Sequence, residues 1–203
     1  METELTANRV GGRATGALFF TGFGAVWLLL GLYAKERLTT AAVSAVIGGA
    51  AVLAGGALAL LRRARALPRA PEDAAMARAF KWINIVEWAA IAVVVFSFSR
   101  LGIDAYVISA ITAIVGLHMF PLARLFRSAL HHLIGTALVA WAVASVFLFR
   151  KDELQGSTAL GTGAILWLSA LLALALAARV LRAQPKAAER RPEAAEEAGW
   201  RMN

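Results

Sequence analysis

The sequence predicts an all-α membrane protein, a bundle of six transmembrane helices with both termini in the cytoplasm. Three observations lead to this prediction: six long apolar stretches, few charged residues, and an unequal distribution of Lys and Arg between the connecting segments. Hydrophobic residues make up 60% and charged residues 17% of the 203 residues, against about 45–50% and 25% in ordinary soluble domains. The mean hydropathy of +0.66 agrees with that class.

Each of the six apolar stretches is long enough to cross a bilayer, because a helix of about 20 residues spans the hydrocarbon core. In lipid the backbone must satisfy its own hydrogen bonds, so each stretch should be helical. The stretches cover residues 14–34, 38–61, 82–99, 103–123, 129–149 and 158–180. The apolar run of the first stretch is longer than that of a signal peptide, so we expect an uncleaved helix. We therefore predict a transmembrane domain over residues 1–183 and a flexible cytoplasmic tail over residues 184–203.

The basic residues define the orientation. With six spans, sixteen Lys and Arg residues fall on one side: two before the first span, six in the second loop, two in the fourth loop and six in the tail. The other side has five. The positive-inside rule then places both termini in the cytoplasm. The same residues predict contact with anionic lipid headgroups rather than with nucleic acid, although the net charge is +8.

Small residues recur at four-residue spacing in the first two stretches. They include Gly12, Gly16 and Gly24 in the first and Ala41, Ala45 and Gly49 in the second. In lipid, small residues let helix backbones approach closely. We predict that they pack the first two helices against each other, and a homodimer face is the alternative.

The third stretch contains an acid inside the apolar region. Asn84, Glu87 and Trp88 lie three and four residues apart, on one face of a helix. Glu87 comes six residues after Lys81, which is about 9 Å of helix rise. An acid at this depth costs a few kcal/mol on insertion scales, so it is expected to have a partner or a function.

The fourth stretch offers that partner. His118 comes six residues before Arg124 and therefore lies at a similar depth on the same side. Glu87 precedes the turn at Gly102 by 15 positions and His118 follows it by 16. Adjacent antiparallel helices would bring the two side chains together, so we predict a contact between Glu87 and His118.

Such a pair has useful chemistry. Histidine titrates near neutral pH, and a neighbouring carboxylate favours the charged imidazolium in general. The pair could pass a proton, hold a polar ligand, or bind a metal together with a third ligand. His131, His132 and Arg124 at the same end are further candidates. No short metal-ligand spacing joins these residues and no cysteine is present, so we expect neither a metal nor a cofactor.

Two functional interpretations follow. One is a small transporter or ligand-binding membrane protein whose polar site comprises Asn84, Glu87, Trp88 and His118. The alternative is a structural or accessory membrane subunit, in which the cluster only fixes helix packing at roughly 0.6–2 kcal/mol per hydrogen bond. An enzyme is less expected, because the sequence has no Ser/His/Asp pattern, no His-Glu-x-x-His and no phosphate-binding loop.

The middle of the chain resembles a group of small bacterial multi-pass membrane proteins of unassigned function. The run from Gly116 to Phe126 is similar to their G-L-H-F-x-P-L-A-R-x-F segment, with Met119 in place of Phe. Asn84, Glu87 and Trp88 match an upstream N-x-x-[Q/E]-W. The resemblance covers residues 80–127 and implies a shared middle hairpin and a location in the bacterial inner membrane. Because Gln can replace the acid in that group, the resemblance favours hydrogen bonding over obligatory proton transfer by Glu87.

Cysteine labelling tests the predicted orientation. In intact cells an impermeant thiol reagent should react with a Glu36→Cys variant, because that turn is predicted to face outward. The reagent should not react with Ala66→Cys, which is predicted to be cytoplasmic. The reverse pattern of labelling would contradict the predicted topology.

Overall fold

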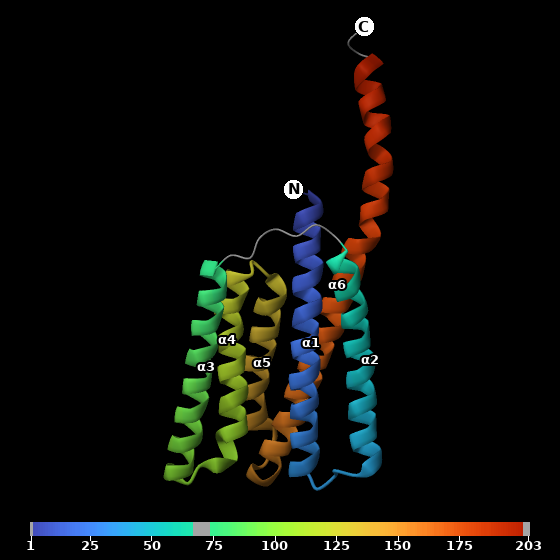
Figure 1. The fold of residues 1–203 in the computed structure, drawn as a ribbon. Coiled ribbons are helices and arrows are strands. Elements are labelled where there is room, and N and C mark those ends of the chain that lie inside the picture. Colours follow the sequence, from blue (N-terminus) through green and yellow to red (C-terminus); the bar gives the residue numbers. More distant parts are fainter. Residues whose placement is uncertain (1, 67–73, 201–203) are drawn as a thin grey trace.

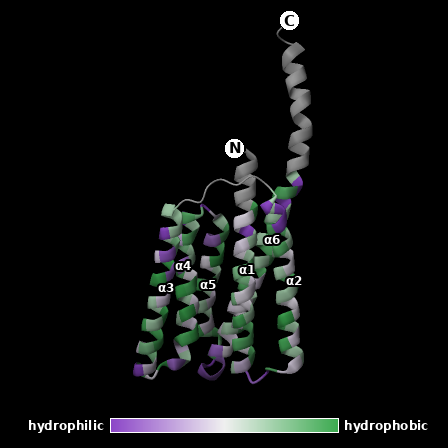
Figure 2. Cartoon of the chain, in the orientation of Figure 1, coloured by the Kyte–Doolittle hydropathy of each residue, from purple (hydrophilic) through white to green (hydrophobic). Residues whose placement is uncertain are grey.

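The computed structural model describes residues 2–66 and 74–200, and side chains at residues 10–66 and 74–183. These ranges form six α-helices and one short 3-10 helix, with no strand among them (Figure 1). All six α-helices are long and apolar enough to cross a membrane, so this part of the prediction is confirmed. Apolar residues dominate their middle sections (Figure 2). In order, the elements are α1 (Glu2–Ala34), α2 (Thr40–Arg65), α3 (Ala74–Leu101), η1 (Asp104–Tyr106), α4 (Val107–Leu125), α5 (Ala129–Leu148) and α6 (Lys151–Trp200).

Helix α6 is longer than the apolar stretch that predicts it. It begins at Lys151 rather than at residue 158, and Asp152 and Glu153 occupy its first turn, where acids complement the helix dipole. Its backbone also continues to Trp200, where the sequence analysis expects a flexible tail. Ala and Glu residues of this segment favour a helix, which the hydropathy argument does not register, whereas Pro185 and Pro192 disfavour it. Residues 201–203 of that predicted tail lie outside the described residues.

The closest helix pair is α1 with α6, which lie side by side and run antiparallel. Gly24 and Gly31 of α1 lie against Gly163 and Gly156 of α6. The same seven-residue spacing continues through buried Ala17 and Val10 on α1 and through buried Ala170 and Ala177 on α6. A seven-residue repeat keeps one stripe of each helix facing the other, as in a coiled coil. We call these eight residues the small-residue seam.

At its four glycines the seam has no room for larger side chains. A Cβ atom added at Gly163 would lie 2.7 Å from Leu28 Cγ and 2.8 Å from the Gly24 carbonyl oxygen, and one at Gly31 would lie 2.9 Å from the Gly156 carbonyl oxygen. The sequence pattern predicts that Gly24 packs against α2. This prediction is wrong, because Gly24 packs against α6. On α2, Gly49 also faces α6, because an added Cβ would meet the Trp167 ring.

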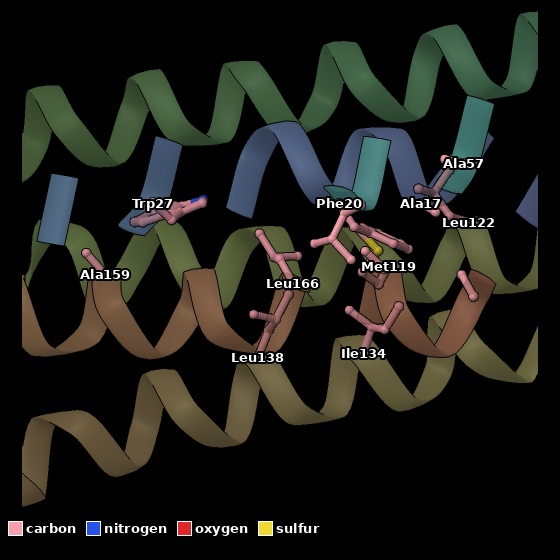
Figure 3. Close-up of a cluster of buried hydrophobic side chains, with 13 residues drawn as sticks. Ala17, Phe20, Trp27, Ala57, Met119, Leu122, Ile134, Leu138, Ala159 and Leu166 are labelled. Atoms are coloured by element: carbon pink, nitrogen blue, oxygen red, sulfur yellow. The ribbon is translucent and has the colours of Figure 1, made fainter. Parts of the chain in front are cut away.

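Helix α6 connects two groups of helices. On one side α1 packs against α6 and α2, and on the other α5 packs against α4 and α4 against α3. The two groups share one hydrophobic core, in which Phe20 of α1 lies beside Met119 of α4 and Ile134 of α5, while Trp27 of α1 lies farther along the core, near Ala159 of α6 (Figure 3). Helix α3 lies at the edge of the bundle, packs on α4 and η1, and has no fully buried residue.

A matched pair of Gly→Ala substitutions tests the seam. Gly163→Ala should destabilise the detergent-solubilised protein by about 1–3 kcal/mol, because the methyl group overpacks a backbone contact. Gly55→Ala on α2 is the control, since an added Cβ there meets nothing within 4 Å. It should be neutral or slightly stabilising through helix propensity. Thermal unfolding followed by circular dichroism measures both, and equal midpoints for the two variants would contradict the packing described.

Candidate functional site

The predicted contact between Glu87 and His118 is confirmed. The Nδ1 atom of His118 lies 3.0 Å from Oε1 of Glu87, and the two side chains are 8% and 12% exposed, respectively. Glu87 comes from α3 and His118 from α4, which form a hairpin around Gly102. Gly102 has a positive φ of 67°, a backbone conformation that favours glycine. At the far end of the hairpin, the Ser99 hydroxyl donates to the Asp104 carboxylate, and Gln155 of α6 donates to the Asp104 carbonyl.

The hydrogen bonding of this pair is incomplete. The His118 Nε2 is buried and has no hydrogen-bond partner within the described chain, and the same is true of Nδ1 of His131. His118 Nδ1 is within reach of the carboxylate, although its N–H direction departs from good hydrogen-bond geometry. A buried polar atom without a partner costs about 1–3 kcal/mol. The cluster therefore has unused capacity to bind a polar group.

The remaining candidate residues are placed differently from the prediction. Asn84 is half-buried, but its amide donates to the Phe80 carbonyl at 2.7 Å, one turn back on the same helix. Trp88 is 60% exposed and therefore points away from the bundle, which corrects its expected place in the site. Arg124 and His132 are exposed at the same end of the bundle. Residues spaced three and four apart share one face of a helix, but the spacing does not show which of them point into the bundle and which point outward. The expected position of Trp88 in the site was wrong for this reason.

His131 belongs to a row of four aromatic rings beside the pair. It is close enough to His118 and His132 for their charges to act on it. Its ring centroid is 5.7 Å from that of Phe126 and 6.1 Å from that of Phe20. Phe126 in turn lies 6.0 Å from Phe80 of α3. These four rings, which we call the aromatic row, connect α3, α4, α5 and α1 on the side of the pair that faces the α2–α3 connection.

A second polar cluster, which the sequence analysis misses, lies nearer the opposite end of the bundle. Five buried hydroxyl groups from three helices meet there: Ser109 and Thr112 on α4, Ser145 on α5, and Thr158 and Thr162 on α6. Ser109 lies 3.3 Å from Ser145 and from Thr158, and Thr112 lies 3.0 Å from Thr162. The spacings Ser-x2-Thr and Thr-x3-Thr are a signal that could have predicted this hydroxyl cluster, because both place the hydroxyls on one helix face.

The hydrogen bonds of the hydroxyl cluster form a closed set. Ser145 donates to the Ala142 carbonyl and Thr162 to the Thr158 carbonyl, so these two hydroxyl protons are used. Thr112 can then donate to Thr162, Ser109 to Ser145 and Thr158 to Ser109, each at the observed distance. Trp141 Nε1 adds a bond to the Thr158 carbonyl. Every hydroxyl proton thus has an acceptor, which is the arrangement expected of a structural contact between helices.

Comparison with known proteins identifies no relative. No protein-family model matches the chain, and neither a curated protein nor a solved structure matches it. Within the described residues, no group of three or more His, Asp and Glu side chains is arranged to hold a metal ion. The chemistry of the candidate site must therefore be inferred from its own atoms: one carboxylate, a buried imidazole with a free nitrogen, and a second imidazole nearby.

Removing the carboxylate should destabilise the protein. Glu87→Ala removes the carboxylate that lies beside the buried Nδ1 of His118, at an expected cost of about 1–3 kcal/mol. Glu153→Ala is the control, because Glu153 is exposed in the first turn of α6, and it should cost at most a few tenths of that through the helix dipole. Thermal unfolding in detergent compares the two variants. Equal stability would show that the Glu87–His118 contact contributes nothing.

Proposed function

We propose that this chain is a multi-pass protein of the bacterial inner membrane, with both termini in the cytoplasm, that binds or transports a small polar ligand. The proposed site is the pair of Glu87 and His118, with His131 beside it. The distribution of Lys and Arg supports the orientation. The resemblance of the middle hairpin to small bacterial membrane proteins supports the location.

The incomplete hydrogen bonding at His118 is the observation that carries the proposal. A contact that only fixes packing is expected to use its polar atoms fully, as the hydroxyl cluster does. His118 instead keeps Nε2 buried and without a partner. If the Nδ1 proton is directed to Glu87, Nε2 is an acceptor; if the ring takes up a proton, Nε2 becomes a donor. The site can therefore bind either a donor or an acceptor, depending on its protonation.

The alternative function, a structural or accessory subunit, predicts a different behaviour of the Glu87–His118 contact. It requires Glu87 and His118 to form a dry contact that exchanges neither protons nor ligands with the surroundings. Two titratable groups lie near His118: Glu87 from α3, and His131 at the start of α5, which interacts electrostatically with it. The pH response of these groups consequently separates the two functions.

Nitrogen NMR of the histidines provides the test, since the chain has three histidines in all. In nanodiscs containing protein labelled with 15N-histidine, the His118 signals should differ between samples at about pH 5 and at about pH 8, because a site that is open to ligands also exchanges protons with the solvent. A His118→Gln sample assigns the signals. Glu87→Gln, which keeps the side-chain shape, should alter the pH profile of His118, whereas Glu153→Gln on the opposite end should leave it unchanged.

Constant His118 signals across this pH range, in the wild type and in Glu87→Gln alike, would overturn the proposed ligand site. Only the structural function would then remain for the pair. The histidine signals are read in the folded protein, so a loss of stability in one variant does not affect the wild-type result.

A further inference from the structure

We infer that the ligand of the Glu87–His118 site is a small organic anion, a carboxylate attached to an apolar body. This inference rests on the proposed function and names the class of ligand. It is carried by three features of the described residues: the charge at this end of the bundle, the unpartnered imidazole nitrogens, and the aromatic row.

The half of the bundle that contains the site is basic on balance. By sequence, this side of the protein has sixteen Lys and Arg residues against nine Asp and Glu residues, a net charge of +7, whereas the opposite side has five against four. The basic residues of the site end with described side chains are Arg13, Arg62, Arg63, Arg65, Arg78, Lys81, Arg124, Arg127, Arg179 and Arg182. A net positive region raises the local concentration of anions, so anionic ligands are favoured at this end of the bundle.

The two unpartnered imidazole nitrogens suit a carboxylate. His118 Nε2 and His131 Nδ1 are buried without hydrogen-bond partners, and the His118 side chain is only 8% exposed. An imidazolium N–H that donates to a carboxylate oxygen forms a charge-assisted bond, which is stronger than a neutral one. Glu87 already lies beside Nδ1 of His118, so Nε2 is the His118 nitrogen that remains for a ligand oxygen.

The aromatic row suits the apolar body of such a ligand. Along the row, Phe20 and Phe126 each lie against the His131 ring and Phe126 lies against Phe80, in tilted contacts with centroids 5.7–6.1 Å apart. Aromatic side chains present large apolar surfaces and bind flat or aliphatic groups well. A cationic ligand is disfavoured here by the basic surroundings. A divalent metal ion is disfavoured because no cluster of three suitable ligands is present in the described part of the chain.

This chemistry could come from water or from the bilayer. Helix α3, which carries Glu87, has no fully buried residue, so the site lies close to the outer surface of the bundle. A water-soluble aromatic acid and a fatty acid share the same carboxylate and differ in where they reside. The experiment therefore includes both.

Three molecules of nearly the same shape test whether the site prefers an anionic, a neutral or a cationic ligand. They are benzoate, benzamide and benzamidinium, respectively. Each is added to the full-length protein in nanodiscs at about pH 6, where benzoate is ionised and histidine is partly protonated. The measurements are the midpoint of thermal unfolding and the 15N signals of His118 and His131. Benzoate should raise the midpoint in a concentration-dependent way, as a ligand of the native state does. It should also shift both histidine signals, whereas benzamide and benzamidinium should do neither.

His118→Gln should weaken benzoate binding by about tenfold or more, the loss expected when a charge-assisted bond to the ligand is removed. The wild-type histidine signals give the same information if this variant does not fold. A parallel sample with decanoate in the nanodiscs tests the bilayer source: tighter binding of decanoate than of benzoate would assign the carboxylate to the membrane. Either carboxylate supports the ligand class.

Two further outcomes distinguish failure of the anion assignment from failure of the proposed ligand site. If benzamide or benzamidinium shifts the His118 signals as much as the carboxylates do, the anion assignment is wrong while the proposed ligand site stands. If no probe shifts these signals and they also fail to respond to pH, the proposed function fails together with the inference.

Discussion

The architecture depends on the close approach of α1 and α6 along the small-residue seam. Gly24 and Gly31 facing Gly163 and Gly156 bring the two backbones together over a long stretch of both helices. Because α6 is tilted in the bundle, its first half reaches α4 and α5 while its second half lies beside α2 (Figure 1). One helix therefore joins both groups. Helix α3 packs mainly on α4, and its Ile83 reaches the edge of the shared hydrophobic core.

This arrangement explains why the two polar clusters differ. The hydroxyl cluster lies where α4, α5 and α6 converge, so three helices supply enough donors and acceptors to satisfy every proton. The Glu87–His118 pair lies between α4 and the peripheral α3, where fewer polar neighbours are available. Unsatisfied polar atoms in a low-dielectric region are costly. The unpartnered nitrogen atoms of His118 lie beside α3, the helix that is least buried in the bundle.

Hydropathy predicted the six helices, and helix geometry predicted the Glu87–His118 contact, because depth along a helix follows from counting residues. The facing direction of each side chain was harder to predict. Trp88 and Asn84 share a helix face with Glu87, yet one is exposed to the outside and the other bonds to its own backbone. The partner of the α1 glycines was also missed, since helices adjacent in sequence were assumed to pack most closely. The seven-residue repeat shared by Gly24, Gly31, Gly156 and Gly163 contains that information, but only when distant segments are compared.

The central claim is that His118 belongs to an open polar site while the hydroxyl cluster is closed. An experimental structure in lipid nanodiscs, at a resolution that shows ordered water, tests it most directly. The account predicts density for water or a bound ligand within hydrogen-bonding distance of His118 Nε2, and none inserted between Ser109, Ser145 and Thr158. A His118 ring whose Nε2 bonds to another protein atom, or is packed only against carbon atoms, would contradict the account.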